Sequence, residues 1–167
     1  MVLVMGKTGK PLKTNETPNG ILNLEFAYSP QKANTVIAAW TKTESQPVDI
    51  LSAAKCNTWW DFVFIFFYAS FLLIACLQIA DKLRYKNFIY RTGRFLAKII
   101  IVEVLLDIME NIGMFQILNG NTSGIITYFT TICSIIKWLM VITVIVFVLI
   151  AGAYALITSK RSNDQGL

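Results

Sequence analysis

Three long apolar blocks constrain this chain more than any other feature of its sequence. They cover residues 59–80, 95–118 and 125–157. About 20 helical residues cross a bilayer core of about 30 Å, so each of the first two blocks fits one span. The third block is longer than one untilted span, and because no proline interrupts it we expect one long helix. The blocks predict an all-α fold, a polytopic helical membrane bundle with three spans in this chain.

The composition agrees with a membrane protein. The chain is 55% hydrophobic and only 15% charged, whereas average soluble domains are about 25% charged. It contains no histidine, which excludes histidine-ligated haem, histidine-containing zinc sites and imidazole-dependent triads. Its three cysteines lie far apart and form no CxxC pair, which argues against a cysteine-rich metal site. We therefore expect no metal and no cofactor.

Charge is distributed unevenly between the segments that join the blocks. Residues 81–98 hold six basic residues and one acid, whereas residues 119–124 hold no charge. The positive-inside rule places the 81–98 loop and the tail, residues 160–167, in the cytoplasm, and residues 7–57 on the other side. We interpret the basic loop as a contact for anionic lipids. We do not expect it to bind nucleic acid, because no separate DNA-binding domain accompanies it.

The segment before the first block divides into two parts. Residues 1–20 begin with six apolar residues, which predict the end of a truncated upstream helix and four spans in the native protein, and continue as a polar linker. The alternative is that an unaided N-terminal tail is translocated. Residues 21–57 predict an extended or turn-like ILNLEFA piece, then an amphipathic helix begun by Ser29 and Pro30. This part is expected to cap the transmembrane bundle, residues 58–159.

The second block carries the most specific signal in the chain, three carboxylates at helical spacing. Glu103, Asp107 and Glu110 recur at i, i+4 and i+7, which places them on one face of a helix, and Asn111 follows them. An intramembrane carboxylate costs roughly 2.5–3.5 kcal/mol even on a lenient insertion scale. This face must therefore point into the bundle or into a wet cavity.

The third block contains one intramembrane cation, Lys137. Lys137 and Asp107 lie at nearly equal distances from the short loop between their helices, about 17 Å at 1.5 Å per residue. Because so short a loop makes the helices antiparallel neighbours, we predict that Lys137 pairs with Asp107, with Glu103 or Glu110 one turn away. One cation cannot neutralise three carboxylates, so at least one carboxyl group is protonated, hydrated or paired elsewhere.

Two further acids lie outside this stripe. Asp61 either reaches the mouth of an interior cavity or is a helix N-terminal acid favoured by the dipole. Glu25 is either solvated or a plug that reaches toward the bundle.

Gly113 predicts a close approach of two helices. Three hydroxyl residues of the third block recur at i, i+4 and i+7 and predict a packing seam: Thr127, Thr131 and Ser134.

Several short motifs of the chain match those of one family. They are ILNLEFA at 21–27, Trp60-Asp61-Phe62, a D-x-x-E-N motif from Asp107 to Asn111, and Lys137-Trp138. Through these motifs, over about residues 21–150, the chain resembles a family of small, uncharacterised bacterial membrane proteins with four spans. The resemblance implies a four-helix bundle in the bacterial cytoplasmic membrane, but no activity. It also implies a polar signature made by Glu25, Asp61, Asp107, Glu110 and Lys137.

Three functions are compatible with these residues. The leading hypothesis is a small integral membrane protein whose buried carboxylate–lysine cluster binds or passes a small ligand, an ion or a proton. The first alternative is a structural or assembly subunit of a membrane complex, as a homo- or hetero-oligomer, in which buried pairs fix helix packing. The second is an intramembrane enzyme acting on lipid-linked substrates. Two carboxylates can support acid–base chemistry, but no nucleophile pattern accompanies them, so an enzyme is the less favoured hypothesis.

Overall fold

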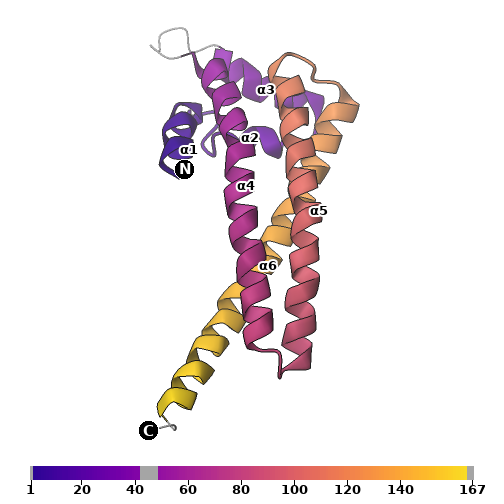
Figure 1. Cartoon of the computed structure of the whole chain (residues 1–167). Coiled ribbons are helices and arrows are strands. Elements are labelled where there is room, and N and C mark those ends of the chain that lie inside the picture. Colours follow the sequence, from indigo (N-terminus) through magenta and orange to yellow (C-terminus); the bar gives the residue numbers. More distant parts are fainter. Residues whose placement is uncertain (1, 42–48, 165–167) are drawn as a thin grey trace. The chain divides into compact units, whose positions relative to one another are not determined.

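The computed structural model describes residues 2–41 and 49–164, with side chains for 5–41 and 49–158, and over these ranges the chain is helical (Figure 1). The all-α prediction is therefore confirmed, since no strand occurs among the described residues. In chain order the elements are α1 (Val2–Gly9), the 3-10 turn η1 (Lys10–Leu12), α2 (Leu22–Glu25), α3 (Pro30–Thr41), α4 (Ile50–Lys82), α5 (Asn87–Leu118) and α6 (Gly124–Asp164).

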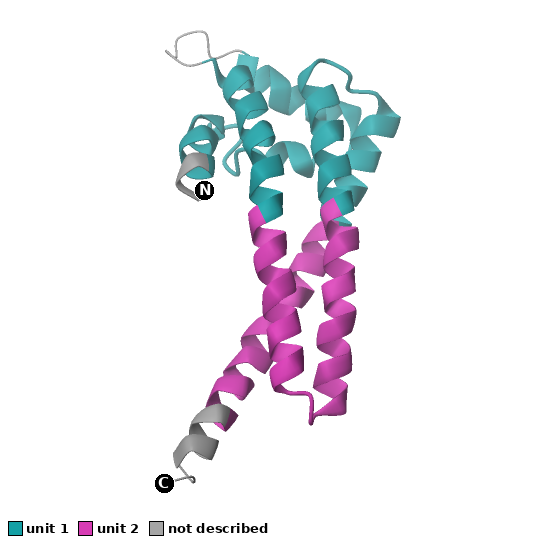
Figure 2. Ribbon diagram, viewed as in Figure 1, with its two compact units in different colours: residues 1–66, 105–136 teal, residues 67–104, 137–167 magenta. Residues whose placement is uncertain are grey.

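The chain folds as two units, and each of the three long helices contributes to both (Figure 2). Unit 1 comprises Met1–Phe66 and Leu105–Ile136. Unit 2 comprises Phe67–Val104 and Lys137–Leu167. The two units are described separately below.

The core of unit 1 is built around Trp40, which is only 2% exposed. Its indole Nε1 donates to the carbonyl oxygen of Leu12 at 3.1 Å and to Oγ1 of Thr17 at 3.0 Å. The Thr17 hydroxyl in turn donates to the Leu12 carbonyl at 2.8 Å. These bonds hold the segment that follows η1 against α3. The apolar core around them also includes Leu24, Ala33, Val36, Ile50, Ala54, Met114 and Ile117.

The ILNLEFA segment forms one helical turn, α2, so of its two expected forms the turn-like one is correct and the extended one is wrong. The chain reverses at Gly20, whose φ of +61° favours glycine. The amides of Leu24 and Glu25 then donate to the Ile21 carbonyl at 2.9 and 3.1 Å, which closes the turn. The next helix begins at Pro30 as predicted, and Ser29 Oγ accepts a capping bond from the Lys32 amide at 3.3 Å.

The expected loop at residues 81–98 is mostly helix, which corrects the sequence interpretation. Helix α4 ends at Lys82 and α5 begins at Asn87, so only residues 83–86 join the two helices. Residues 87–98 are helical because apolar and small residues recur there at helical spacing and are buried, whereas the basic ones lie on the outer face. The buried residues of this stretch are Gly93, Leu96 and Ala97. The prediction of one long helix for the third block is confirmed by α6.

Unit 2 is held together by small side chains between its helices. A Cβ atom on Gly93 of α5 would lie 2.9 Å from Cβ of Ala80 on α4 and 3.1 Å from Cζ of Phe147 on α6. Gly93 therefore allows close packing among the three helices of this unit. The surrounding core contains Ala69, Leu72, Cys76, Leu96, Ala97, Ile100 and Val144.

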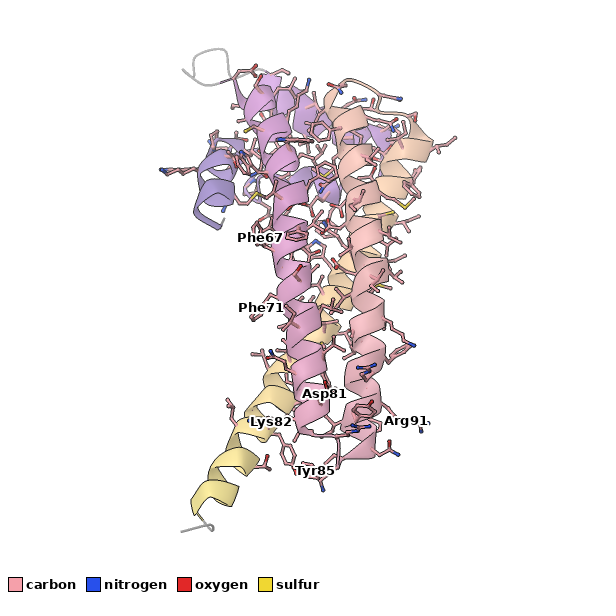
Figure 3. All side chains as sticks on the ribbon, in the orientation of Figure 1. Phe67, Phe71, Asp81, Lys82, Tyr85 and Arg91 are labelled. Atoms are coloured by element: carbon pink, nitrogen blue, oxygen red, sulfur yellow. The ribbon has the colours of Figure 1, made fainter. Side chains whose placement is uncertain are left out.

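The outer faces of the long helices are apolar. Phe67 and Phe71, for example, are 57% and 67% exposed and project from α4 away from its neighbours (Figure 3). In the described part of the chain, two helices are long and apolar enough to cross a membrane, α4 over Ile50–Lys82 and α6 over Gly124–Thr158. Helix α5 is not one of them, because acids and cations interrupt its apolar stretch, so the third span remains a prediction.

Candidate functional site

The three carboxylates of α5, which we call the acidic stripe, lie on a buried face as their spacing predicted. Glu103, Asp107 and Glu110 are 2%, 3% and 0% exposed. The remaining surface of the same helix segment is apolar and open, with exposed fractions of 44–59% at Ile101, Leu105, Met109 and Ile112. The helix therefore turns its charged side chains inward and its apolar side chains outward.

Asn111 connects this face of α5 to α4 within unit 1. Its Nδ2 donates to Oδ2 of Asp61 at 2.8 Å, and Asn111 is 2% exposed. Asp61 lies eleven residues after Ile50, where α4 begins. The interpretation of Asp61 as a helix N-terminal acid is therefore wrong, because the first turn of α4 is formed by residues well before it.

Glu103 is engaged within unit 2 by a residue that sequence reasoning missed. Its Oε1 accepts a short hydrogen bond from the Tyr68 hydroxyl of α4. A signal was present in the sequence, because Tyr68 follows Asp61 by seven residues, or about two helical turns, and therefore shares its face of α4. Asp61 and Tyr68 of α4 thus each form a hydrogen bond to α5, Asp61 in unit 1 and Tyr68 in unit 2.

Hydroxyl side chains form a buried row along the part of α6 that belongs to unit 1. The predicted seam of Thr127, Thr131 and Ser134 is confirmed as buried, and Thr130, which the spacing did not include, is 0% exposed as well. Thr127 Oγ1 donates to the Ser123 carbonyl at 2.6 Å and Thr130 Oγ1 to the Ile126 carbonyl at 2.8 Å. Among the described residues, Oγ1 of Thr131 is buried and has no hydrogen-bond partner.

Gly113 and Thr130 fix how α5 and α6 pack in unit 1. A Cβ atom on Gly113 would overlap Thr130 Oγ1, so the close approach predicted for this glycine is confirmed. The two helices are antiparallel around a short connection. One turn further along each helix, this register brings Glu110 to the level of Ser134. A carboxyl group and a buried hydroxyl group thus share one level of unit 1.

Glu25 belongs to the same unit and is 8% exposed, so the solvated alternative is wrong. Its carbonyl oxygen accepts a hydrogen bond from Ser134 Oγ at 3.3 Å, and the backbone carbonyl oxygen of Thr130 accepts from the same hydroxyl at 3.0 Å. The single turn α2 therefore rests on the hydroxyl row of α6. Unit 1 contains four of the candidate acids: Glu25, Asp61, Asp107 and Glu110.

Lys137 is buried, with 7% of its surface exposed. It belongs to unit 2 together with Glu103, whereas Asp107 belongs to unit 1. The ion pair of Lys137 with Asp107 therefore stays a prediction.

Comparison with known proteins adds no family to these findings. No family model matches the chain, and no curated protein or solved structure matches it significantly. The resemblance to the four-span family thus stays a prediction. Within the described ranges, no group of three or more cysteine or acidic side chains is arranged to hold a metal ion. The chemistry of the site is accordingly inferred from its own side chains.

Proposed function

We propose that this chain is a small helical membrane protein whose acidic stripe takes up and releases protons. The observation that carries the proposal is the burial of Glu103, Asp107 and Glu110 on one face of a helix that exposes apolar side chains elsewhere. An arrangement with acids inside and hydrocarbon outside is the reverse of a water-soluble helix.

The exposed apolar surface supports the membrane setting. Large apolar side chains are exposed along all three long helices, including Phe66 on α4, Leu105 on α5 and Leu149 on α6, at 68%, 56% and 66%. Soluble monomers rarely expose contiguous apolar patches larger than a few hundred Å². Lipid contact along these faces supports α5 as a third span, since its acids do not face the lipid.

The charge distribution supports an orientation. The basic residues around the α4–α5 connection are exposed, among them Lys82 and Arg91, which lie near the end of α4 and the beginning of α5 (Figure 3). We propose that this end faces the cytoplasm and that residues 7–57 lie on the opposite side.

Cysteine labelling tests this orientation without any insertion into the chain. Cys56 is exposed, whereas Cys76 and Cys133 are buried. A membrane-impermeant thiol reagent added to intact cells is expected to label the wild type but not Cys56→Ser. Labelling of Cys56 only after the cells are opened would reverse the proposed orientation.

The geometry of the stripe suits proton exchange. A charge buried in an apolar interior is costly, and a carboxyl group removes that cost by taking a proton. Successive members of the stripe are about one helical turn apart, at i, i+4 and i+7. Hydroxyl groups can both donate and accept. In unit 2 the Tyr68 hydroxyl donates to Glu103, and in unit 1 the register of Gly113 and Thr130 brings Ser134 to the level of Glu110.

Proton flux into vesicles tests the proposal. The full chain, reconstituted into vesicles that enclose a pH-sensitive dye, is expected to dissipate an imposed pH gradient faster than protein-free vesicles. Glu110→Gln keeps the shape of the side chain but cannot ionise, so flux should fall to the protein-free rate. The matched control is Glu16→Gln, which changes an exposed acid and should leave flux unchanged. Equal flux in the wild type and Glu110→Gln would overturn the proposal.

A structural role is the second candidate, because two hydrogen bonds of the site join helices. Tyr68 with Glu103 links α4 to α5 in unit 2, and Asn111 with Asp61 links the same helices in unit 1. Buried polar pairs of this kind can fix helix register. If this is their whole role, Tyr68→Phe and Asn111→Ala should lower the unfolding temperature, and the wild type should carry no proton flux.

A further inference from the structure

Unit 2 carries an apolar groove between the beginning of α5 and the last part of α6. Its volume is about 350 Å³, and the atoms that line it are apolar. The groove is open to the surroundings and has no role in the acidic stripe. Its walls include Phe88, Ile89 and Thr92 from α5 and Phe147, Ile150 and Ala151 from α6.

The groove lies at the most basic part of the chain. The first residue of its α5 wall, Phe88, is two positions from Lys86, and Arg91 stands between Ile89 and Thr92. Lys86 Nζ lies 5.8 Å from the centre of the Tyr85 ring, at the connection between the helices. Four exposed cations lie in the connection or within five residues of it, with one exposed acid, Asp81, among them: Lys82, Arg84, Lys86 and Arg91.

We propose that this groove binds one acyl chain of an anionic phospholipid, with the lipid phosphate held by Lys86 and Arg91. An apolar channel beside a set of cations complements a molecule that joins a hydrocarbon chain to a negative headgroup. Lys and Arg side chains at the edge of an apolar surface extend their charged ends toward such headgroups. The proposal shares the membrane setting of the proposed function but not its proton chemistry.

Charge favours a lipid over a second copy of the chain. Two copies that met through this groove would bring two sets of four cations together, and like charges at an interface are unfavourable. An anionic lipid neutralises the same cations. We therefore assign the groove to a lipid.

Native mass spectrometry of the full chain in detergent tests the assignment. The protein is mixed with equal amounts of phosphatidylglycerol and phosphatidylcholine that carry the same acyl chains. We expect phosphatidylglycerol to remain bound preferentially, and the double variant Lys86→Gln, Arg91→Gln to lose that preference. Since each cation near a lipid headgroup is worth about fivefold in binding, the double variant should weaken phosphatidylglycerol binding by roughly 25-fold. Its control is Lys10→Gln with Lys13→Gln, which removes two exposed cations of unit 1.

A second pair of variants tests the groove itself. Phe88→Ala shortens one wall, and because Phe88 is 82% exposed the core is not disturbed. Its matched control is Phe71→Ala, another exposed phenylalanine of unit 2 that does not line the groove. We expect Phe88→Ala to reduce the retention of both lipids and Phe71→Ala to leave it unchanged.

Three outcomes would overturn the assignment. The first is equal retention of the two lipids by the wild type, which would indicate a headgroup-independent detergent-like contact. The second is an equal effect of Phe71→Ala and Phe88→Ala. The third is a dimer that the Phe88→Ala change dissociates, which would assign the groove to a second copy of the chain. Proton flux is not part of any of these readouts, so failure here and failure of the proposed function are distinguishable.

Discussion

Asn111 donates a hydrogen bond from Nδ2 to Oδ2 of Asp61 over 2.8 Å and thereby joins α5 to α4 within unit 1. We expect Asn111→Ala to lower the free energy of unfolding by about 0.6–2 kcal/mol, the range measured for hydrogen bonds between membrane helices. Unfolding of the purified protein in detergent measures the change. Asn119→Ala, which removes the same amide from an exposed position, is the control and should be neutral.

The Asp61–Asn111 pair can also be tested by asking whether a second substitution restores stability. If the bond matters chiefly because it satisfies buried polar groups, the double variant Asp61→Leu, Asn111→Leu should be more stable than Asn111→Leu alone. A double variant that is less stable than either single variant would show that Asp61 has a further role in the fold.

Gly113 offers a second prediction, because a Cβ atom there would overlap Thr130 Oγ1. Gly113→Ala should destabilise the protein by about 1–3 kcal/mol through overpacking. Thr130→Ala removes the overlapping oxygen and leaves a Cβ contact of 3.3 Å. We therefore expect it to restore part of the stability of Gly113→Ala in a double-variant cycle.

The control for this cycle is Gly6→Ala, because no atom lies within 4 Å of a Cβ built at Gly6. It should be neutral or slightly stabilising, since alanine favours a helix. Equal destabilisation by the two glycine substitutions would argue against a steric effect at Gly113.

Tyr68 gives a third prediction through its hydrogen bond to Glu103. Tyr68→Phe removes only the hydroxyl group and should cost about 0.6–2 kcal/mol of unfolding free energy. Glu103→Gln keeps an oxygen that can accept the bond, so it should cost less than Tyr68→Phe. Tyr85→Phe, at a position 63% exposed, is the matched control. A larger loss for Glu103→Gln than for Tyr68→Phe would contradict this account of the pair.

The beginning of α4 gives a prediction on pH. Asp49 Oδ2 accepts from the Ser52 hydroxyl at 2.6 Å, and Oδ1 accepts from the amides of Leu51 and Ser52. The Ser52 bonds, led by its hydroxyl, hold the pKa of Asp49 below its ordinary value of 3.8. Because the folded state lowers this pKa, the cap stabilises the helix fully above pH 3.8 and is lost as the pH falls through the lowered value.

Hydrogen exchange at the first turn of α4 measures this effect. We expect the Leu51 and Ser52 amides to exchange faster in Asp49→Ala than in the wild type at neutral pH. The difference should shrink below the lowered pKa, where the wild-type cap is itself protonated. A difference that persists unchanged at that pH would show that the carboxylate charge is not responsible.

Much of the fold follows from the apolar blocks and their spacing. The long helices, the inward face of Glu103, Asp107 and Glu110, and the packing role of Gly113 could all be predicted, because each depends on the periodicity of a single helix. The seam of α6 was predicted for the same reason. These features lie within one element, where sequence distance determines spatial direction.

Features that depend on contacts between elements were missed. Tyr68 was overlooked because its partner lies on another helix. The 81–98 segment was taken as a loop because charge was given more weight than the small and apolar residues between the cations, although charges on the outer face of a helix do not end it.

Lipid accessibility along α5 tests the central claim most directly. A nitroxide spin label placed at each position from 101 to 112, one variant at a time in lipid vesicles, reports its exposure to oxygen, which concentrates in the bilayer. We predict maxima at 101, 105, 109 and 112 and minima at 103, 107 and 110, with a helical period of about 3.6 residues. Maxima at the carboxylate positions, or uniform exposure of the whole segment to a water-soluble relaxation agent, would contradict the claim that the acids of α5 face the protein interior.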